Sequence, residues 1–526
     1  MASPYHNVPS CVLVNNWAGS RGTANATTAA YKTSTGLPIT ATFCAAPPLA
    51  FSYISVHCPG IDGTNSFMTP TVISEDADLV LLRVPRERGS MRVNPQRPQL
   101  DLLPNPSLEN LVDNEIAVVS CGDDKYVVAA LQFVFGLKPT FKLHLYRSTG
   151  CYKQGTWTSQ LLYVEEPLRD KVCPIPESAD MQMYHRTTKV IVLGGDKGTV
   201  GWVDLWRGIV LCDVLSDRPT LQDLPLPLPA EGNLDRFLNC CPSYYRDIAV
   251  NERKDTIKHV EMEITPPTSL FDVPPGSDLY WVSYHRRPES VEPGTWTTTT
   301  WTMPIPVASW DDWSVDCSVS LDELSLSNRR VYKTLHRLVT AEDDEEGTND
   351  DVDGADDTDD EEGTDDTNDD DDEQEDTGGT PPIGSLSMAY PTLTILDDDV
   401  VYLLSESNCE RMSKGNIASL ITVDVGKEIL QGVEVLGNNR FFGRDFHASG
   451  ISRCLEHGRL RDGAGGATTQ GPQKSRRPGS EPRAIVRVDT ENRGRRMENC
   501  HLGRGSFLFA FVAFFGLALA CGLWRR

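Results

Sequence analysis

The sequence predicts an all-β body, and two observations support that prediction. From Cys11 to about Thr340 the chain contains short runs rich in Val, Ile, Leu, Tyr and Trp, separated by clusters of Pro, Gly, Asp and Asn. Runs of this length and content are typical of β-strands. In addition, no amphipathic helical pattern of useful length stands out, and many runs are too closely spaced for the helical crossovers of a parallel α/β sheet.

The predicted strands lie on both sides of a long acidic stretch. Those before it are Phe51–His57, Leu79–Val84, Ile116–Cys121, Tyr126–Phe135, Phe141–Tyr146, Thr188–Leu193, Thr199–Val203, Ile209–Val214, Thr256–Ile264 and Leu279–Tyr284. Those after it are Leu393–Leu396, Val400–Leu404, Leu420–Val425 and Ile429–Val435. The acidic stretch is therefore predicted to be an insertion within the β-body.

The clearest predicted hairpin covers residues 199–214. Two β-type runs flank Leu205–Gly208, and Gly208 stands where a positive φ would be easiest to adopt. We therefore expect a positive φ at Gly208. The following stretch Leu224–Pro229 alternates Leu with Pro, so it cannot lie in a central strand and is expected to be an extended connection between sheets.

The acidic stretch carries nearly all of the net charge. Between Glu342 and Asp376, 23 residues are acidic and none is Lys or Arg, whereas the formal charge of the whole chain is −26. Such a composition has too little apolar area to offset the entropy of an ordered chain. We therefore predict a disordered acidic insertion at residues 341–382, within a β-domain formed by residues 10–340 and 386–457.

The C-terminal part changes composition twice. Residues 458–504 contain 11 basic and 5 acidic residues and are predicted to be a disordered basic linker. Residues 505–524 carry no charge, and a helix of this length rises ~1.5 Å per residue, enough to cross the ~30 Å hydrocarbon core. We predict a single-pass transmembrane helix there with the body in the cytosol; a buried C-terminal helix, with a cytoplasmic or nuclear protein, is the alternative.

The N-terminus and the cysteines both indicate that the body lies in the cytosol. Residues 1–20 have neither a basic region nor a continuous apolar run, so no secretory signal is predicted. The 14 cysteines are scattered and form no CxxC pair. Most are therefore expected to be reduced, buried thiols.

Two neighbouring segments, Thr188–Gly195 and Gly201–Leu215, carry a resemblance to a known family. With them the chain resembles the domain of unknown function 1618, a plant family expanded in grasses. Further similar segments are Cys11–Val14, Thr27–Gly36, His57–Gly60, Leu81–Val84, Leu143–Ser148, Arg246–Val250 and Ala389–Leu393. The resemblance covers roughly residues 10–340 and 386–455, and it implies a β-propeller-like body, similar to domains associated with F-box proteins, with no known activity. The chain has no recognisable F-box.

The size of the body is compatible with a propeller. Roughly 400 ordered residues, at the ~40–50 residues of a four-stranded blade, would make several blades. The repeats are not visibly periodic, so paired β-sandwiches remain the alternative.

No motif assigns a catalytic, cofactor-binding or metal-binding residue. Gly194–Gly198 lacks the spacing of a phosphate-binding loop and is predicted to be a turn between strands. Asn349–Asp360 imitates a calcium loop but lacks the bidentate Glu at its twelfth position. The zinc-binding motif HExxH and the nucleophile motif GxSxG of serine hydrolases are absent as well. We therefore expect no cofactor and no metal.

Several residues have a structural and a functional interpretation. His144 alternates with Leu143 and Leu145, so it is expected to be a solvated or hydrogen-bonded histidine on the opposite face of a strand. Asp204 and Asp213 near Arg207 are expected to form an ion pair that braces the hairpin. For the tryptophans, packing between sheets is favoured over ligand stacking; they are Trp202, Trp206, Trp296, Trp301, Trp310 and Trp313.

These observations predict a non-enzymatic binding scaffold with an unknown protein partner, tethered to a membrane through residues 505–524. No specific binding of nucleic acid is expected. An enzyme or glycan-binding propeller, with site residues dispersed on loops, is the alternative, and a concave cluster of Asp, Glu and His at one mouth of the body would favour it. A third possibility is an acidic, nuclear-type binder of basic proteins.

Overall fold

The structure is a computed structural model, and it describes the β-body of the protein. Residues 11–452 are described with gaps, of which the longest are 60–68, 93–100, 104–110, 266–294, 341–386, 407–417 and 438–445; residues 483–487 are described after them. The predicted acidic insertion, the predicted transmembrane helix and the predicted strand Leu279–Tyr284 lie outside the described residues. No helix among the described residues is long and apolar enough to span a bilayer.

The described strands form six sheets, which we number in chain order. The first contains β1 (Val12–Asn15), β2 (Ala29–Lys32), β3 (Pro38–Cys44), β4 (Phe51–His57) and β26 (Phe446–Ser449). The second contains β5 (Thr71–Asp76), β6 (Leu79–Arg83), β7 (Ser90–Arg92), β8 (Asp101–Leu103) and β27 (Arg483–Arg487). The third contains β9 (Ile116–Ser120), β10 (Tyr126–Val134), β11 (Thr140–Arg147) and β12 (Thr156–Tyr163).

The remaining three sheets follow in the same manner. The fourth contains β13 (Lys189–Gly194), β14 (Thr199–Asp204), β15 (Gly208–Asp213) and β16 (Leu221–Pro225). The fifth contains β17 (Arg246–Val250), β18 (Thr256–Thr265), β19 (Thr295–Pro304) and β20 (Ser314–Ser320). The sixth contains β21 (Ser325–Leu326), β22 (Ser387–Leu393), β23 (Val400–Glu406), β24 (Ala418–Asp424) and β25 (Ile429–Gly437).

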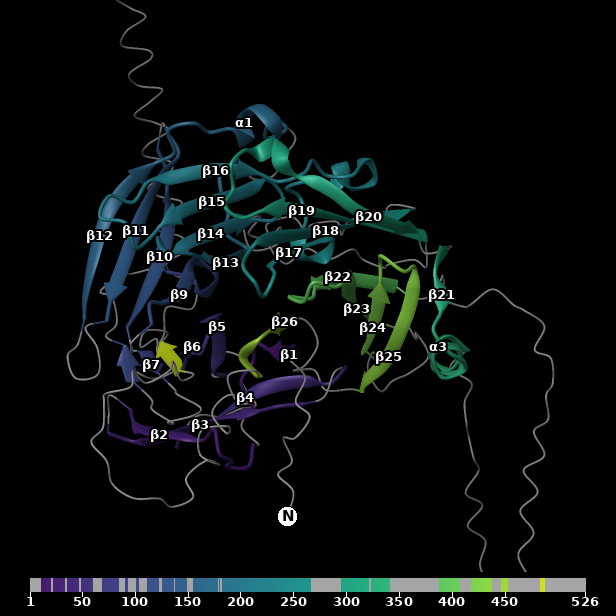
Figure 1. Ribbon diagram of the computed structural model, residues 1–526, viewed down its shortest axis with the longest axis horizontal. Helices are drawn as coiled ribbons and strands as arrows, with labels where there is room; N and C mark the ends of the chain where they lie inside the picture. Colours follow the sequence, from purple (N-terminus) through teal and green to yellow (C-terminus); the bar gives the residue numbers. More distant parts are fainter. Residues whose placement is uncertain are drawn as a thin grey trace, which may run out of the picture.

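Each sheet packs against the next through an apolar cluster. The sheets are thereby arranged in a ring (Figure 1). Because side chains alternate between the two faces of a strand, each sheet supplies two clusters. Thus Leu143 of the third sheet packs with Trp202 of the fourth, whereas Val128 of the third packs with Leu79 of the second. The last cluster joins Leu404 of the sixth sheet to the first sheet. The ring confirms the propeller-like prediction and excludes the paired sandwiches.

The ring closes where the two ends of the described body meet. β26 pairs antiparallel with β1, with Val12 opposite Ser449 and Asn15 opposite Phe446. The first sheet therefore combines strands from the beginning and the end of residues 11–452. The pairing with β26 covers an edge of β1 that would otherwise be open to pairing with another chain.

The predicted hairpin is confirmed, but the predicted conformation of Gly208 is wrong. β14 and β15 pair from Thr199 and Asp213 to Asp204 and Gly208. Gly208 is not among the described glycines with positive φ. Instead, a Cβ at Gly208 would lie 2.6 Å from the carbonyl oxygen of Leu224 in β16. The glycine is therefore required by the close approach of two backbones.

We expect Gly208→Ala to lower the free energy of unfolding by about 1–3 kcal/mol, because backbone atoms must shift to admit the methyl group. Chemical denaturation measures this loss. Gly136→Ala is the matched control, since the nearest atom to its Cβ would be 3.7 Å away. Equal denaturation midpoints for the two variants would show that the backbone of β16 can move away from the methyl group without loss of stability.

Three other sequence expectations are corrected. A helix was not expected, yet α3 (Arg329–Thr340) buries Val331 and Leu335 on one side. Its apolar residues are few but follow helical spacing, which the polar residues between them obscure. Leu224 and Pro225 belong to β16 and not to a connection, but β16 is the outer strand of its sheet, so the expectation that this stretch avoids a central strand is confirmed. Within the predicted linker, β27 pairs in parallel with β6.

Candidate functional site

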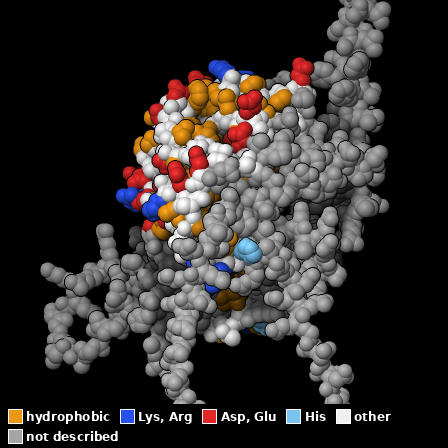
Figure 2. Space-filling model, turned by 90° about the vertical axis from the view of Figure 1, so that its right-hand side faces the viewer, with side chains coloured by type: hydrophobic (Ala, Val, Ile, Leu, Met, Phe, Trp, Pro, Cys, Tyr) orange, Lys and Arg blue, Asp and Glu red, His pale blue; other side chains and the backbone are white. Residues whose placement is uncertain are grey.

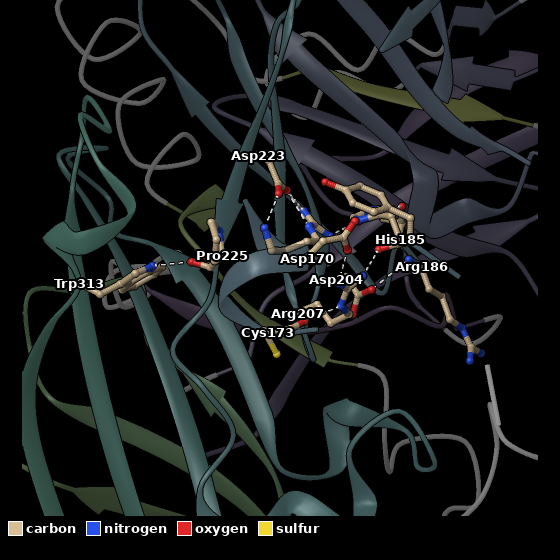
Figure 3. Close-up of polar contacts among 12 residues, drawn as sticks. Asp170, Cys173, His185, Arg186, Asp204, Arg207, Asp223, Pro225 and Trp313 are labelled. Atoms are coloured by element: carbon tan, nitrogen blue, oxygen red, sulfur yellow. Dashed lines mark hydrogen bonds and ion pairs between the residues drawn. The ribbon is translucent and has the colours of Figure 1, made fainter. Parts of the chain in front are cut away.

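Three fully buried arginines, Arg169, Arg207 and Arg246, form a cluster where α1 (Arg169–Val172), the β14–β15 turn, β16 and the start of β17 meet. Figure 3 shows the part of this cluster around Arg207. Arg169 donates from Nε to Asp223 Oδ1 at 2.6 Å, and the backbone N–H of Arg169 donates to Asp223 Oδ2 at 2.8 Å. Neither side chain of this ion pair is exposed. A buried ion pair of this kind is stable only when both partners are satisfied.

His185 completes the polar surroundings of Arg169. Arg169 Nη1 donates to His185 Nδ1 at 2.9 Å, which requires His185 to carry its proton on Nε2 and to donate it to Thr187 Oγ1 at 3.1 Å. Burial lowers the pKa of His185 well below its usual value, and the charges of Arg169 and Arg207 lower it further. His185 is therefore a neutral acceptor with a fixed tautomer.

Arg207 braces the hairpin, but not through the predicted partners. Its Nη2 pairs with Asp170 Oδ1 at 2.7 Å, and its other nitrogens donate to the carbonyl oxygens of Cys173 and Tyr184 (Figure 3). Asp204 instead accepts the backbone N–H groups of Arg186 and Trp206. The predicted pairing of Arg207 with Asp204 and Asp213 is therefore wrong.

Asp213 lies at the far end of β15, where Lys197 and Thr199 contact it at 3.3 and 2.7 Å. The hairpin sequence alone could not show this, because Asp213 is the last of the six residues of β15 and therefore lies far along an extended strand from the turn that carries Arg207.

Arg246 ties the fifth sheet to the fourth. Its Nη2 pairs with Glu261 Oε2 at 2.7 Å, and its Nη1 donates to the carbonyl oxygen of Leu205 at 3.1 Å. Its guanidinium carbon lies 5.6 Å from the centre of the Trp206 ring, within the range of a cation–π contact. These contacts make the arginine cluster a structural brace, since its donors point at groups of the fold itself.

The turns at one end of the inner strands are joined by paired charges. Asp76, at the end of β5, accepts the backbone N–H of Ser120 at 2.7 Å and pairs with Lys254 of the β17–β18 turn. The second and fifth sheets are three positions apart in the ring, so this pair reaches across it. In the same region Asn251 and Arg253 contact Asp397. The carboxylates of Asp76 and Asp397 are therefore neutralised by the fold.

A third candidate lies on the outer rim of the fifth sheet. Its members are partly or largely exposed apolar residues of the β19–β20 hairpin, which we call the tryptophan rim: Trp301, Trp310, Trp313 and Val315. Trp301 stands opposite Val315 in the register of the two strands. Trp310 lies in the turn η5 (Trp310–Asp312) with 38% of its surface exposed, and Val315 is 63% exposed.

Two tryptophans of the rim are held in place by buried partners. Trp313 Nε1 donates to the carbonyl oxygen of Pro225 at 3.0 Å, so it links the residue just before β20 to the outer strand of the fourth sheet (Figure 3). The Trp301 ring lies 5.3 Å from the ring of the buried His259, which is 6.1 Å from Trp313. The rim therefore presents aromatic surface from a rigid support.

The other expectations for single residues can now be compared with the structure. His144 is buried on the face opposite Leu143, and its Nδ1 is 2.7 Å from Ser159 Oγ, which confirms a hydrogen-bonded strand histidine. The Gly194–Gly198 segment is confirmed as a turn between β13 and β14. The calcium-like segment Asn349–Asp360 lies outside the described residues.

The tryptophans divide into two groups. Trp202, Trp206 and Trp296 are buried between sheets, as predicted. Trp310 is exposed, and Trp301 and Trp313 are only partly buried, so for these three the packing interpretation is incomplete.

Groups of three or more His, Cys, Asp or Glu that could hold a metal ion are not found in the part of the chain that the structure describes. The cysteines described there are free thiols, and Cys173, Cys212 and Cys240 are among those that are buried.

Comparison with known proteins places one region of the chain in a family. Residues 202–402 match the family described as protein of unknown function, DUF1618. The chain carries a DUF1618 region. This region runs from β14 to β23, so it includes the fifth sheet, the tryptophan rim and most of the arginine cluster. Among curated proteins, none matches the chain significantly.

The DUF1618 region holds a feature that sequence reasoning missed. Between Thr295 and Asn328 the chain has four tryptophans and five acidic residues, but no Lys, Arg or His. This bias could have indicated an exposed surface, because a tryptophan-rich segment that only filled a core would not need so many acidic neighbours.

Proposed function

We propose that this protein is a non-enzymatic binding scaffold that holds a partner protein at the tryptophan rim. The observation that supports this most is the exposure of Trp310 and Val315 on a hairpin in which His259 and Pro225 hold Trp301 and Trp313 in place. Tryptophan is enriched among the residues that dominate binding energy at protein interfaces. A rigid aromatic anchor also loses little conformational entropy on binding.

The position of the rim strengthens the proposal. β20 is the outermost strand of the fifth sheet, and among the described residues it pairs only with β19. An outer strand offers backbone donors and acceptors to an extended chain that lies alongside it. In Figure 2, which shows the side where β20, β21 and α3 lie, hydrophobic and acidic side chains are mixed on the upper part of the described surface.

The test is a selection of peptides from a random library on the full chain. We expect the selected peptides to lose at least about tenfold in affinity, or ~1.4 kcal/mol, for the variant Trp310→Ala/Val315→Thr. Both residues are exposed, so the variant should keep its fold. Tyr163→Ala is the control, because Tyr163 is an aromatic residue that is even more exposed than Trp310 (53% against 38%) and lies on β12, the outer strand of the third sheet.

The outcomes separate the candidates. Peptides that bind the variant as well as the parent chain would contradict the proposal. Neutral oligosaccharides that bind at Trp310, where no peptide does, would favour the glycan-binding alternative.

We also propose that residues 505–524 tether the scaffold to a membrane. Twenty uncharged residues in a row, including five phenylalanines, support this. The full chain is expected to stay in the membrane pellet after carbonate washing. Phe514→Arg should cost about 2.5–3.5 kcal/mol of insertion energy and release much of the protein, whereas recovery of the parent chain in the supernatant would refute the tether.

A further inference from the structure

We infer that the segment recognised by the tryptophan rim is an extended, cationic polypeptide. This inference rests on the proposed function and adds the chemistry of the partner. Three features of the β19–β20 hairpin support it: its charge, its aromatic surface and the edge of β20, which is unpaired among the described strands.

The charge of the hairpin is of one sign. From Thr295 to Asn328 there is no basic residue, and the acidic residues are Asp311, Asp312, Asp316, Asp322 and Glu323. Asp311, Asp312 and Asp316 are exposed beside Trp310 and Val315 in the sequence. Asp312 accepts the backbone N–H of Ser309 at 3.0 Å, and no ion pair of these three aspartates is found in the described part of the chain. The field over the rim therefore favours a cation.

The aromatic surface favours the same kind of ligand. The face of a tryptophan ring carries negative potential, so it attracts the guanidinium of Arg or the ammonium of Lys. Exposed carboxylates next to such a ring add hydrogen-bond acceptors for the same groups. An acidic peptide would meet repulsion from both, and a purely apolar one would leave the aspartates without partners.

The strand edge determines the shape of the ligand. β20 runs over seven residues, and its register with β19 shifts between Thr300 and Trp301, opposite Cys317 and Val315. Asp316 is the extra residue at this bulge, which bends the strand locally. An extended segment pairing along β20 would place alternate side chains over the rim, at the spacing of a strand.

The acidic run supplies a second, distinct contribution. Glu342 follows the end of α3 at Thr340 by two residues, and the run from Glu342 to Asp376 contains 23 acidic residues. α3 comes soon after β20 in the chain, on the same side of the body (Figure 1). Charge of this size raises the association rate of a cationic partner, while short-range contacts at the rim set its dissociation rate.

The experiment uses the full chain and a fluorescein-labelled peptide of alternating Arg and Thr. The matched peptide has citrulline at each Arg position, which keeps the shape and removes the charge. Fluorescence anisotropy should show that the Arg peptide binds at least about tenfold more tightly, and that added salt weakens it. Trp310→Ala and Asp311→Asn/Asp316→Asn should each weaken the Arg peptide by about threefold to thirtyfold, whereas Tyr163→Ala should not.

A variant with Asn and Gln in place of the acids in 342–376 should slow association and leave the dissociation rate unchanged. Equal affinity for the two peptides would overturn the inference, as would binding that depends on residues 342–376 but not on Trp310. If neutral library peptides bind at Trp310 and the Arg peptide does not, the inference fails while the proposed function stands.

Discussion

Replacing Asp223 with Ala is expected to lower the free energy of unfolding by about 3–5 kcal/mol, because it leaves the Arg169 guanidinium buried without its counter-charge. Both side chains of the Arg169–Asp223 pair are fully buried, at 2.6 Å. Asp223 also accepts the backbone N–H of Arg169, so the variant loses an anchor of α1 as well. Urea denaturation of the parent and variant chains measures the difference.

Lys197→Met provides the control for this loss. The Lys197–Asp213 pair is 3.3 Å long, but 73% of the lysine side chain is exposed. Ion pairs at the surface contribute only about 0–1 kcal/mol, so the control should change little. If Asp223→Ala proved no more harmful than Lys197→Met, Arg169 would have another route to solvation, and the arginine cluster would not brace the fold.

Acid is expected to destabilise the protein through three buried histidines. Burial lowers the pKa of His144 to about 4, with a further contribution from Lys142, and it lowers those of His185 and His259 well below the usual value. The charges of Arg169 and Arg207 lower the pKa of His185 further, and the charge of Arg246 lowers the pKa of His259 further. In the folded protein the three rings therefore stay neutral at pH 5.

The sign of the effect follows from the direction of these shifts. A histidine in the unfolded chain has a pKa of ~6.5. Below this pH the unfolded chain therefore binds protons at these histidines that the folded chain does not bind. The stability is fully present above pH ~6.5 and falls by about 1.4 kcal/mol per pH unit for each histidine. Between pH 7 and 5 the three together should remove ~6 kcal/mol.

One histidine can be isolated by substitution. His259→Gln should reduce the slope of unfolding free energy against pH by about 1.4 kcal/mol per unit in this window. Glutamine can still donate to the carbonyl oxygen of Asp247, which His259 Nδ1 contacts at 2.9 Å. Substitution of the exposed His57 is the control. A slope that does not change in His259→Gln would mean that this ring is protonated in the folded state.

The sequence predicted apolar strands well and polar strands poorly. β4 was predicted with its observed bounds, because Phe51–His57 is a short run of mainly apolar, β-type residues followed by a Pro-Gly turn signal. β19 was missed: in Thr295–Pro304 most positions are Thr, which favours extended backbone without marking a buried face. Its neighbour β20 was missed because most of its residues are polar and exposed, so no apolar face marks it as a strand.

Features that depend on distant residues could not be predicted from local pattern. The partners Arg169 and Asp223 are 54 positions apart, and neither is unusual in its own segment. The exposure of Trp310 follows from its place on an outer turn, whereas Trp202 is buried because β14 lies within its sheet. Sequence reasoning treated both as core residues, because residue type alone does not say which strand is outermost.

The most direct measurement of the central proposal is hydrogen–deuterium exchange of the full chain with and without a library-selected peptide. If the rim binds by strand addition, the backbone N–H groups of residues 310–320 should exchange more slowly when the peptide is present, because the free edge of β20 gains partners. The turns that carry Asp76 and Lys254 should be unaffected. Protection at those turns, with unchanged exchange in residues 310–320, would contradict the proposal and place the binding site at the end of the ring.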